Sequence, residues 1–299
     1  MSLRNAFFFA AGIVFLGLAK AKNVLRGYST PKPFDPSDTE KNVAYDLNVV
    51  DQWLVHLANY TGMRADLTGK NILELGPGSD LGIGLLLLAK GAARYNACDV
   101  NNLARSAPAA FYQSLFRTLK AIDADADIQR LAGSLHSLVS GAGGELNYVV
   151  RDDFDLVAAF GRRTIDVVFS QAAFEHFDDP EATIAGLSEI CRPGAVIVAE
   201  IDLQTHSRWI RTKDPNNIYR YPDGLYNLFR FRGSPNRVRP YRDRELFQQH
   251  GWTNVLTTPL TTLDGFSIGK SGLSRRFAGD VNQMDQLTLL LCATKSHAS

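Results

Sequence analysis

The sequence has few cysteines, almost no net charge and no low-complexity tract or internal repeat. Its three cysteines, Cys98, Cys191 and Cys292, lie far apart in apolar segments and form neither a metal-binding spacing nor a disulfide framework. We therefore expect a protein of the reducing cytoplasm. The net charge of +1 provides no overall field toward nucleic acid. What remains is a globular chain of 299 residues with ample core for one large domain or two small ones.

The only long apolar run stands at the N-terminus, over residues 6–19. A bilayer requires roughly 20 such residues, so this run is short for a transmembrane helix. Basic residues flank it: Arg4, Lys20, Lys22 and Arg26. We expect residues 1–30 to form an apolar helix that contacts the inner face of a membrane peripherally through residues 4–26. A cleaved secretory signal, or a helix docked on the protein's own surface or on a partner, is the alternative.

A glycine-rich turn follows the first buried strand, Ile72–Leu75. Gly76 and Gly78 let the backbone approach a ligand closely, because a side chain there would collide with it. An apolar helix follows, and a second short strand ends at Asp99, 23 residues beyond Gly76. This order predicts a strand–helix–strand unit that holds a nucleoside cofactor, with the carboxylate near ribose hydroxyls.

Strand and helix patterns alternate through the rest of the chain, which predicts an α/β fold with a mainly parallel sheet. Proline-rich residues 31–37 are expected to form a linker. The expected helices cover residues 42–59, 85–89, 109–120, 128–139 and 180–191, and the further strands cover 146–150, 165–170, 195–201, 254–257 and 287–294. Two stretches, at about 101–146 and 203–245, are longer than a simple crossover needs, and we expect them to form a helical and loop cap over the site.

Several short motifs occur in a fixed order: Glu74-Leu-Gly-Pro-Gly78, Asp99, Phe169-Ser-Gln-Ala-Ala-Phe-Glu-His176, Cys191-Arg-Pro-Gly194 and the closing Ala293-Thr-Lys295. Together they resemble the class I S-adenosylmethionine-dependent methyltransferases. The resemblance implies a Rossmann-like, seven-stranded, mostly parallel sheet with helices on both faces, within a methyltransferase domain over residues 31–299. It departs from the family at Asp80, where a third glycine is usual.

The resemblance also implies S-adenosyl-L-methionine as the cofactor and gives roles to particular residues. Glu74, Gly76, Gly78 and Asp80 would surround the methionine end, and Asp99 would accept hydrogen bonds from both ribose hydroxyls. Asp152, Asp153 and Phe154 would flank the adenine, and Ser170 and Gln171 would line the donor methyl. From the residues alone, Asp99 could instead cap a helix, and Asp152 could be a surface acid.

Methyl transfer to oxygen benefits from a base close to the acceptor. Candidates must lie at the carboxyl ends of the fourth and fifth strands, and His176, His206 and Asp202 satisfy that condition. We expect one of the two histidines to act as the base, with Asp202 orienting it or serving as a metal ligand. His176 could equally be a packed core histidine. We assign no metal site from the sequence.

Residues 207–244 interleave ten basic residues with seven aromatic ones. Arginine binds phosphate or carboxylate, and aromatic faces bind sugars or bases. We therefore expect substrate contacts from Arg208, Trp209, Arg237, Arg239 and Tyr241, although the same residues could form a small core of their own. The expected acceptor is a small or lipid-linked anionic molecule or saccharide. Residues 236–243 also resemble, weakly, a segment of methyltransferases from bacterial surface-polysaccharide pathways.

Two other enzyme classes fit part of the sequence. The turn from Gly76 to Gly82 can be compared with the dinucleotide site of an NAD(P)-dependent oxidoreductase, but Pro77 and the two final strands argue against it. The basic, aromatic insert could bind RNA, as in an RNA methyltransferase. The near-neutral charge and the absence of an RNA-binding module argue against that, so we expect no nucleic acid partner. A binding protein without catalytic activity is the third alternative, and the sequence leaves the oligomeric state open.

Overall fold

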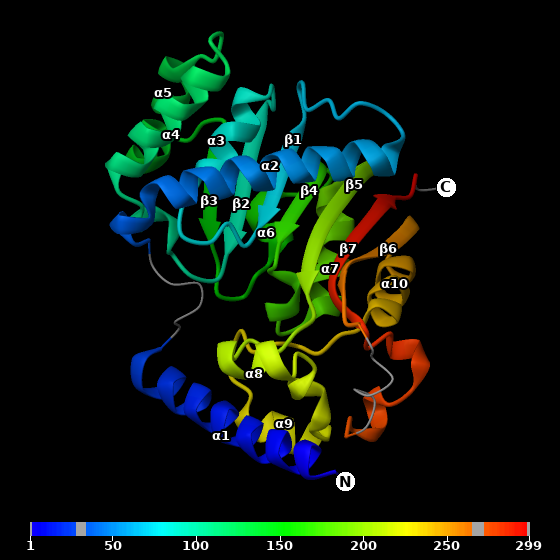
Figure 1. The fold of residues 1–299 in the computed structure, drawn as a ribbon. Helices are drawn as coiled ribbons and strands as arrows, with labels where there is room; N and C mark the ends of the chain where they lie inside the picture. The colour runs from blue at the N-terminus through cyan, green and yellow to red at the C-terminus, as the bar shows by residue number, and fades with distance from the viewer. Residues whose placement is uncertain (1, 28–33, 265–271, 298–299) are drawn as a thin grey trace.

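A seven-stranded sheet forms the centre of the protein (Figure 1). The computed structural model describes residues 2–27, 34–264 and 272–297. The strand order is β3-β2-β1-β4-β5-β7-β6, and β7 runs in the direction opposite to the other six strands of this sheet. The strands are β1 (Asn71–Leu75), β2 (Arg94–Asp99), β3 (Leu146–Val150), β4 (Ile165–Gln171), β5 (Cys191–Asp202), β6 (Trp252–Thr262) and β7 (Gln286–Lys295). The predicted α/β, Rossmann-like, mostly parallel sheet is confirmed.

Side-chain alternation along β1 divides the hydrophobic core into two layers. Ile72 packs on one face of the sheet, whereas Leu73 and Leu75 pack on the other. The first face is covered by α2 (Thr39–Thr61), α3 (Gly82–Ala89), α4 (Ala109–Ile122) and α5 (Ile128–Ser140). Four consecutive leucines of α3, residues 85–88, are each 1% exposed or less, which stabilises the fold by about 1.5–3 kcal/mol for each side chain.

The second face of the sheet is covered by three helices. They are α6 (Leu156–Phe160), α7 (Pro180–Ile190) and α10 (Pro240–Gln249). Asp179 caps α7, because its carboxylate accepts a hydrogen bond from the backbone amide of Ala182 at 2.9 Å. Pro180 stands at the first helical position, where the missing N–H is harmless. The start of α7 is thereby fixed beside the carboxyl end of β4.

A second, smaller core lies beyond the carboxyl end of the sheet (Figure 1). It contains the insert elements η4 (Asn217–Arg220) and α9 (Asp223–Phe229), together with α1 (Leu3–Arg26). The insert also forms α8 (Arg208–Lys213). The buried residues of this core are Ile218, Tyr219, Tyr221, Tyr226, Phe277 and Met284. Phe277 and Met284 come from the segment before β7, which the sequence did not associate with the cap. We call this unit, formed by residues 203–239 and 272–285, the cap.

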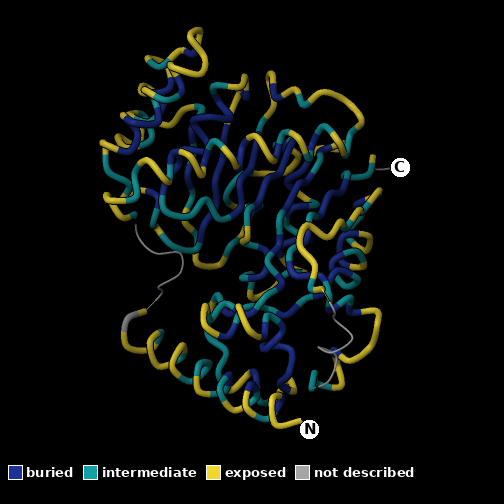
Figure 2. Tube along the Cα trace, in the orientation of Figure 1, coloured by how far each residue is buried: buried dark blue, intermediate teal, exposed yellow. Residues whose placement is uncertain are grey.

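Hydrogen bonds fix α1 on the cap. Asn217 donates its amide hydrogen to the backbone oxygen of Phe8 at 2.9 Å, and the Tyr221 hydroxyl donates to that of Phe9 at 3.2 Å. Gly12 lies where a Cβ would come within 1.9 Å of the Tyr221 oxygen. The N-terminal helix is therefore packed on this chain along one side, whereas its other side is exposed (Figure 2).

The first insertion and the proline-rich linker differ from what the sequence predicted. Residues 101–146 form α4 and α5, which pack on α2, α3 and β3, and contribute nothing to the wall of the cavity described below. Only the second insertion therefore lies above the carboxyl ends of the strands. Residues 31–33 of the predicted linker lie outside the described residues, and Pro36–Asp38 forms a short 3-10 helix.

Candidate functional site

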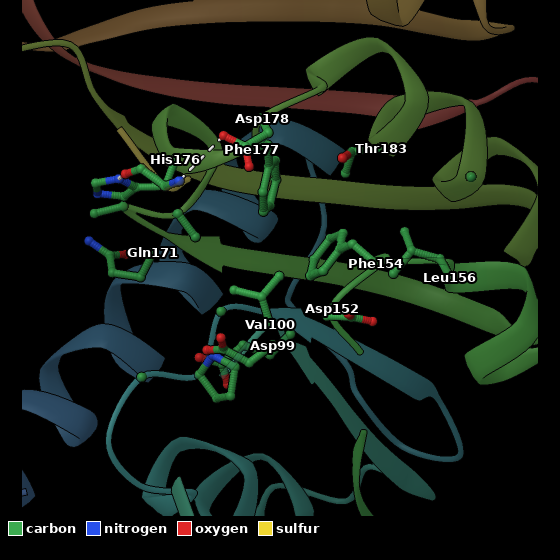
Figure 3. Close-up of a pocket in the computed structure, with 18 of the residues that line it drawn as sticks. Asp99, Val100, Asp152, Phe154, Leu156, Gln171, His176, Phe177, Asp178 and Thr183 are labelled. Carbon is green, nitrogen blue, oxygen red and sulfur yellow. Dashed lines mark hydrogen bonds between the residues drawn. The ribbon is translucent and has the colours of Figure 1, made fainter. Parts of the chain in front are cut away.

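A cavity of about 780 Å³ opens at the carboxyl ends of β1, β2, β3 and β4. Open parallel α/β sheets bind ligands at this edge. Figure 3 shows His176 and Gln171 at one end of the cavity, Asp152, Phe154 and Leu156 at the other, and Asp99 between them. Of the predicted cofactor residues, all but Ser170 line this cavity: Glu74, Gly76, Gly78, Asp80, Asp99, Asp152, Asp153, Phe154 and Gln171.

The glycine-rich turn has the backbone that close approach to a ligand needs. Gly76 and Gly78 have φ values of +74° and +78°, which residues with a side chain rarely adopt. A Cβ at Gly76 would come within 2.8 Å of the Ala173 Cβ, whereas one at Gly78 would meet no atom within 4 Å. The space above Gly78 is thus open to a ligand.

Asp80 stands in place of the usual third glycine, and its side chain closes the turn by a hydrogen bond. Its carboxylate accepts a hydrogen bond from the amide of Gly82 at 3.0 Å. A Cβ on Gly82 would come within 2.0 Å of the Asp46 carboxylate, and one on Gly84 within 2.4 Å of the Tyr95 ring. The close packing of helix and strand is therefore supplied by Gly82 and Gly84, which leaves Asp80 on the wall of the cavity.

Three buried carboxyl groups gather beside this turn. Burial raises the pKa of Glu74 to about 8; the Tyr95 hydroxyl, which donates to it at 2.5 Å, partly opposes this rise. Burial and the neighbouring Asp80 raise the pKa of Asp46 to about 10, and burial raises that of Asp80. Neighbouring carboxyl groups disfavour each other's ionised form, so the pKa of each is raised. A bound cation would relieve this repulsion.

Asp99 ends β2 and turns its carboxylate toward the cavity. One oxygen accepts the amide hydrogen of Asn101 at 2.9 Å, which fixes the side chain. Burial raises the pKa of this carboxyl group, and the backbone hydrogen bonds from Asn101, Val100 and Gly78 oppose that rise. The arrangement leaves acceptor capacity for hydroxyl groups of a ligand.

The end of the cavity at β3 carries the predicted adenine residues. Asp153 is paired with Arg151 at 2.6 Å, and this pairing lowers its pKa to about 2. Asp152 makes no such pair with any described residue, and its backbone oxygen accepts a hydrogen bond from Arg232. Phe154 has a φ of +51° and packs against Phe177 with ring centroids 5.1 Å apart. Strained backbone at a non-glycine residue is common at binding sites. Asp152 is therefore the better candidate for a polar contact with a ligand.

The two predicted residues at the end of β4 have different surroundings. Ser170 is fully buried and donates its hydroxyl hydrogen to the backbone oxygen of Leu75 at 3.2 Å, so it joins two strands instead of lining the cavity. Gln171 lines the cavity, and its side-chain oxygen accepts a hydrogen bond from the Trp53 indole at 3.1 Å. The amide nitrogen of Gln171 is oriented by that bond.

The three predicted catalytic residues lie together at the carboxyl ends of β4 and β5. The rings of His176 and His206 are 4.7 Å apart between centroids, and His206 Nε2 lies 3.6 Å from Asp202. Burial lowers the pKa of His176, and burial together with His176 lowers that of His206 to about 4. Both rings are therefore neutral at pH 7. Only His176 of the three lines the cavity.

The predicted substrate residues do not line the cavity. Arg237 and Arg239 are buried. The guanidinium group of Arg237 donates to the backbone oxygens of Ile218 and Tyr221 in the cap. That of Arg239 donates to the backbone oxygens of residues 282 and 283 in the cap and of Gln286 at the start of β7. Arg237 also pairs with Asp223. Since these donors hold the cap together, we remove both arginines from the substrate-binding set. Their contacts favour the alternative of a small core, to which Phe277 and Met284 from outside the insert also belong.

The other three predicted substrate residues lie outside the cavity as well. Trp209 is 45% exposed and stacks on Phe15 of α1, with ring centroids 5.8 Å apart. Arg208 is exposed beside it, and Tyr241 belongs to α10. None of the three lines the cavity, so their role in binding a substrate stays a prediction.

Several residues of the wall were not predicted. Three of them lie on α2: Asn42, Tyr45 and Asp46. The sequence signal that could have indicated them is the polar face of this amphipathic helix. Arg232 and Gly233 reach the cavity from the cap. The cavity thus receives both charged and neutral polar groups from outside the sheet.

Carboxyl groups dominate the charge of this cavity. Ten acidic residues line it: Asp46, Glu74, Asp80, Asp99, Asp152, Asp153, Asp155, Asp178, Asp179 and Glu189. Among the described residues, the one arginine in its wall is Arg232. Such a lining favours a ligand with positive charge, as the sulfonium and ammonium groups of S-adenosylmethionine carry.

A sequence model of the family described as methyltransferase domain matches residues 49–257, which is more than half of the chain. No curated protein matches the sequence. Among solved structures, the CurJ carbon methyltransferase is 15% identical, with 96% of this chain and 67% of that chain covered and a TM-score of 0.43.

Two further structures are similarly distant. Phosphoethanolamine N-methyltransferase 2 of Haemonchus contortus, in complex with S-adenosyl-L-methionine, is 14% identical, with coverages of 83% and 53% and a TM-score of 0.46. An S-adenosylmethionine-dependent methyltransferase from Mesorhizobium loti is 12% identical, with coverages of 79% and 96% and a TM-score of 0.40. These scores are below 0.5, so the assignment of the chain to a family depends on the sequence match.

Proposed function

The chain belongs to the methyltransferase domain family and is an S-adenosyl-L-methionine-dependent enzyme, and from this premise we propose that it methylates a hydroxyl oxygen of a small or lipid-linked saccharide. The observation that carries this proposal is the acid-lined cavity with His176 at one end and Asp99 in its middle. The cofactor's sulfonium supplies an activated methyl group, and the protein's task is to hold and activate the acceptor.

We infer the orientation of the cofactor from the chemistry of the wall. Asp152 and Phe154 suit the adenine amine and ring, and Asp99 suits the ribose hydroxyls. The methionine end, with its ammonium group, suits the carboxyl groups of Glu74, Asp80 and Asp46. In this orientation the donor methyl faces the end of the cavity at Gln171 and His176, because the sulfur lies between the ribose and the methionine.

Activation of the acceptor falls to the histidines at that end. In the proposed step, the hydroxyl group loses its proton to His176, its oxygen forms a bond to the methyl carbon, and the carbon–sulfur bond breaks with its electron pair left on sulfur. His176 is neutral at pH 7 and lines the cavity, which suits it to accept that proton. His206 and Asp202 lie behind it and act as positioning residues.

A saccharide hydroxyl fits this cavity better than an anionic group does. The carboxyl groups of the wall that are ionised would repel a phosphate or carboxylate close to the reacting carbon. An anionic part of the acceptor would lie outward, near Arg232 and the exposed basic residues of the cap. The same repulsion disfavours RNA as the acceptor.

The exposed face of α1 supports a lipid-linked acceptor and a cytoplasmic protein at the inner face of a membrane. The helix is apolar enough and long enough to cross a membrane, but Asn217 and Tyr221 bond it along one side to the cap. Apolar side chains project from its other side: Leu3, Phe7, Val14 and Leu18 are 57–92% exposed. With Arg4, Lys22 and Trp209 nearby in the fold, this face suits a helix lying in the lipid interface.

A labelled-methyl assay tests the reaction. The enzyme is incubated with S-adenosylmethionine carrying a ¹³C methyl group and with extracted lipid-linked sugars, soluble sugars or total RNA in separate tubes. The proposal predicts an O-methyl carbon signal on the sugars that is lost with His176→Ala. Label on nitrogen, on carbon or in the RNA would contradict it.

Membrane contact is tested on the exposed side of α1 alone. The double variant Val14→Glu and Leu18→Glu should abolish co-sedimentation with anionic vesicles, because both side chains are 59% exposed. Val139→Glu, on an exposed apolar residue of α5, is the matched control and should bind as the wild type does. Equal sedimentation of all three proteins would contradict the interfacial role.

A further inference from the structure

Three potential metal ligands meet where the cap covers the ends of β4 and β5. Glu175 and His176 lie in the short 3-10 helix η3 (Phe174–His176), and His206 follows β5. One ligand atom from each of the three residues lies within 4.8 Å of the others. Ligands around a zinc ion at 2.0–2.2 Å stand roughly 3.4 Å apart, so a small side-chain closure would complete the set.

Two atoms of this group are buried without a partner. Glu175 is 5% exposed, and among the described residues its Oε2 accepts no hydrogen bond. The Nε2 atom of His206 is likewise buried without a hydrogen bond. A buried polar atom without a partner destabilises the folded state, and such atoms point to a ligand that satisfies them.

His176 is already arranged as metal-binding histidines are. Its Nδ1 lies 2.6 Å from the backbone oxygen of Gly233, to which it donates a hydrogen bond. The hydrogen on Nδ1 leaves a lone pair on Nε2, and the bond fixes the direction of the ring. Behind His206 stands Asp202, 3.6 Å from its Nε2 and itself paired with Arg211.

We propose that Glu175, His176 and His206 bind one divalent transition-metal ion. Two imidazoles and one carboxylate are a ligand set of catalytic zinc sites and of iron(II) or manganese(II) sites with open positions. Magnesium and calcium prefer all-oxygen ligand sets, so they fit less well. Three protein ligands leave at least one position open, and His176 carries the site to the edge of the cavity.

Metal binding at this site does not depend on the proposed function, but a catalytic role for the bound ion rests on it. If the acceptor is a hydroxyl group, a bound ion at this end of the cavity would lower the pKa of that hydroxyl, and the histidines would act as ligands in place of a free base. Loss of the ion would then reduce methyl transfer without changing the affinity for the cofactor.

The test uses the full-length, tag-free protein after dialysis against a chelator. Zinc chloride is titrated into it by calorimetry, and bound metal is counted by mass spectrometry after gel filtration. We expect one zinc ion per chain and at least tenfold weaker binding by Glu175→Gln and by His206→Ala. His136→Ala, which removes an exposed histidine of α5, is the matched control and should bind zinc as the wild type does.

Binding of S-adenosylhomocysteine reports the folding of each variant separately. Zinc binding that is absent from the wild type, or unchanged in both Glu175→Gln and His206→Ala, would overturn the proposal. Zinc bound by these ligands in a protein that transfers no methyl group to oxygen would support the site and refute the proposed function. Full O-methylation by the metal-free protein, with no zinc bound on titration, would refute the metal site and support the proposed function.

Discussion

Binding of the cofactor should release a proton from Glu74. This carboxyl group is 1% exposed, and burial raises its pKa to about 8, so it is mostly protonated at pH 7 before the cofactor binds. Asp80, Asp99 and the Tyr95 hydroxyl face it. A unit positive charge about 6 Å away interacts with a carboxylate by about 2.8 kcal/mol at an effective dielectric of 20, which lowers its pKa by about 2 units.

The magnitude follows from linkage. A pKa that falls from about 8 to about 6 on binding increases the affinity about 25-fold between pH 6 and pH 8, with little gain above pH 9. About 0.8 proton is released at pH 7 on the same reasoning. The sign is fixed by charge: the cation prefers the ionised carboxylate, so affinity rises as pH rises.

Calorimetry with S-adenosylmethionine in two buffers of different ionisation enthalpy measures that proton directly. Glu74→Gln keeps the shape and the contact with Tyr95, and it should bind like the wild type at pH 5 but about 50-fold more weakly at pH 8. The coupled pair Asp46 and Asp80 is present in both proteins, so the difference isolates Glu74. An affinity that falls with rising pH, or the same pH dependence in both proteins, would refute the reasoning.

Three further predictions follow from single contacts. Asp99→Asn retains the hydrogen bond from Asn101 but loses the charge, so calorimetry should show about 10- to 100-fold weaker cofactor binding with an unchanged Tm; equal affinity would count against a ribose contact. Gly76→Ala combines a φ of +74° with a 2.8 Å contact to Ala173, so thermal denaturation should show at least ~1–2 kcal/mol of destabilisation, and wild-type stability would contradict the contact. Tyr221→Phe loses the hydrogen bonds to Asn217 and to the Phe9 backbone oxygen, which should lower the local stability of α1 by about 1–2 kcal/mol. Amide hydrogen exchange should therefore be faster in α1 and unchanged in the central strands. Exchange in α1 at the wild-type rate would mean that these bonds do not hold the helix.

Local pattern predicted most strands of the sheet because they contain runs of apolar residues. The apolar run Ile165–Ser170 and the exact limits of β3, Leu146–Val150, could be read without any knowledge of neighbours. The predicted β6 was too short, because its middle residues are exposed and carry no apolar signal beyond residue 257. The place of Asp99 in the cavity was predicted from its position at the end of β2.

Long-range packing set the limits of prediction in the candidate site. Arg237 and Arg239 have the composition of a binding surface, but their partners are backbone oxygens up to 47 residues away, which no local pattern indicates. Asp46 reaches the cavity because Gly82 lets α2 come close to the turn. The pairing of His206 with His176 depends on how the chain turns after β5, and their closeness was predicted only from the shared edge of the sheet.

A crystal structure with S-adenosylhomocysteine tests the central claim most directly. The account predicts ribose hydroxyls within hydrogen-bond distance of the Asp99 carboxylate and the sulfur at the end of the cavity lined by Gln171 and His176. A product molecule bound elsewhere, or bound with its sulfur at the end near Asp152, would contradict it.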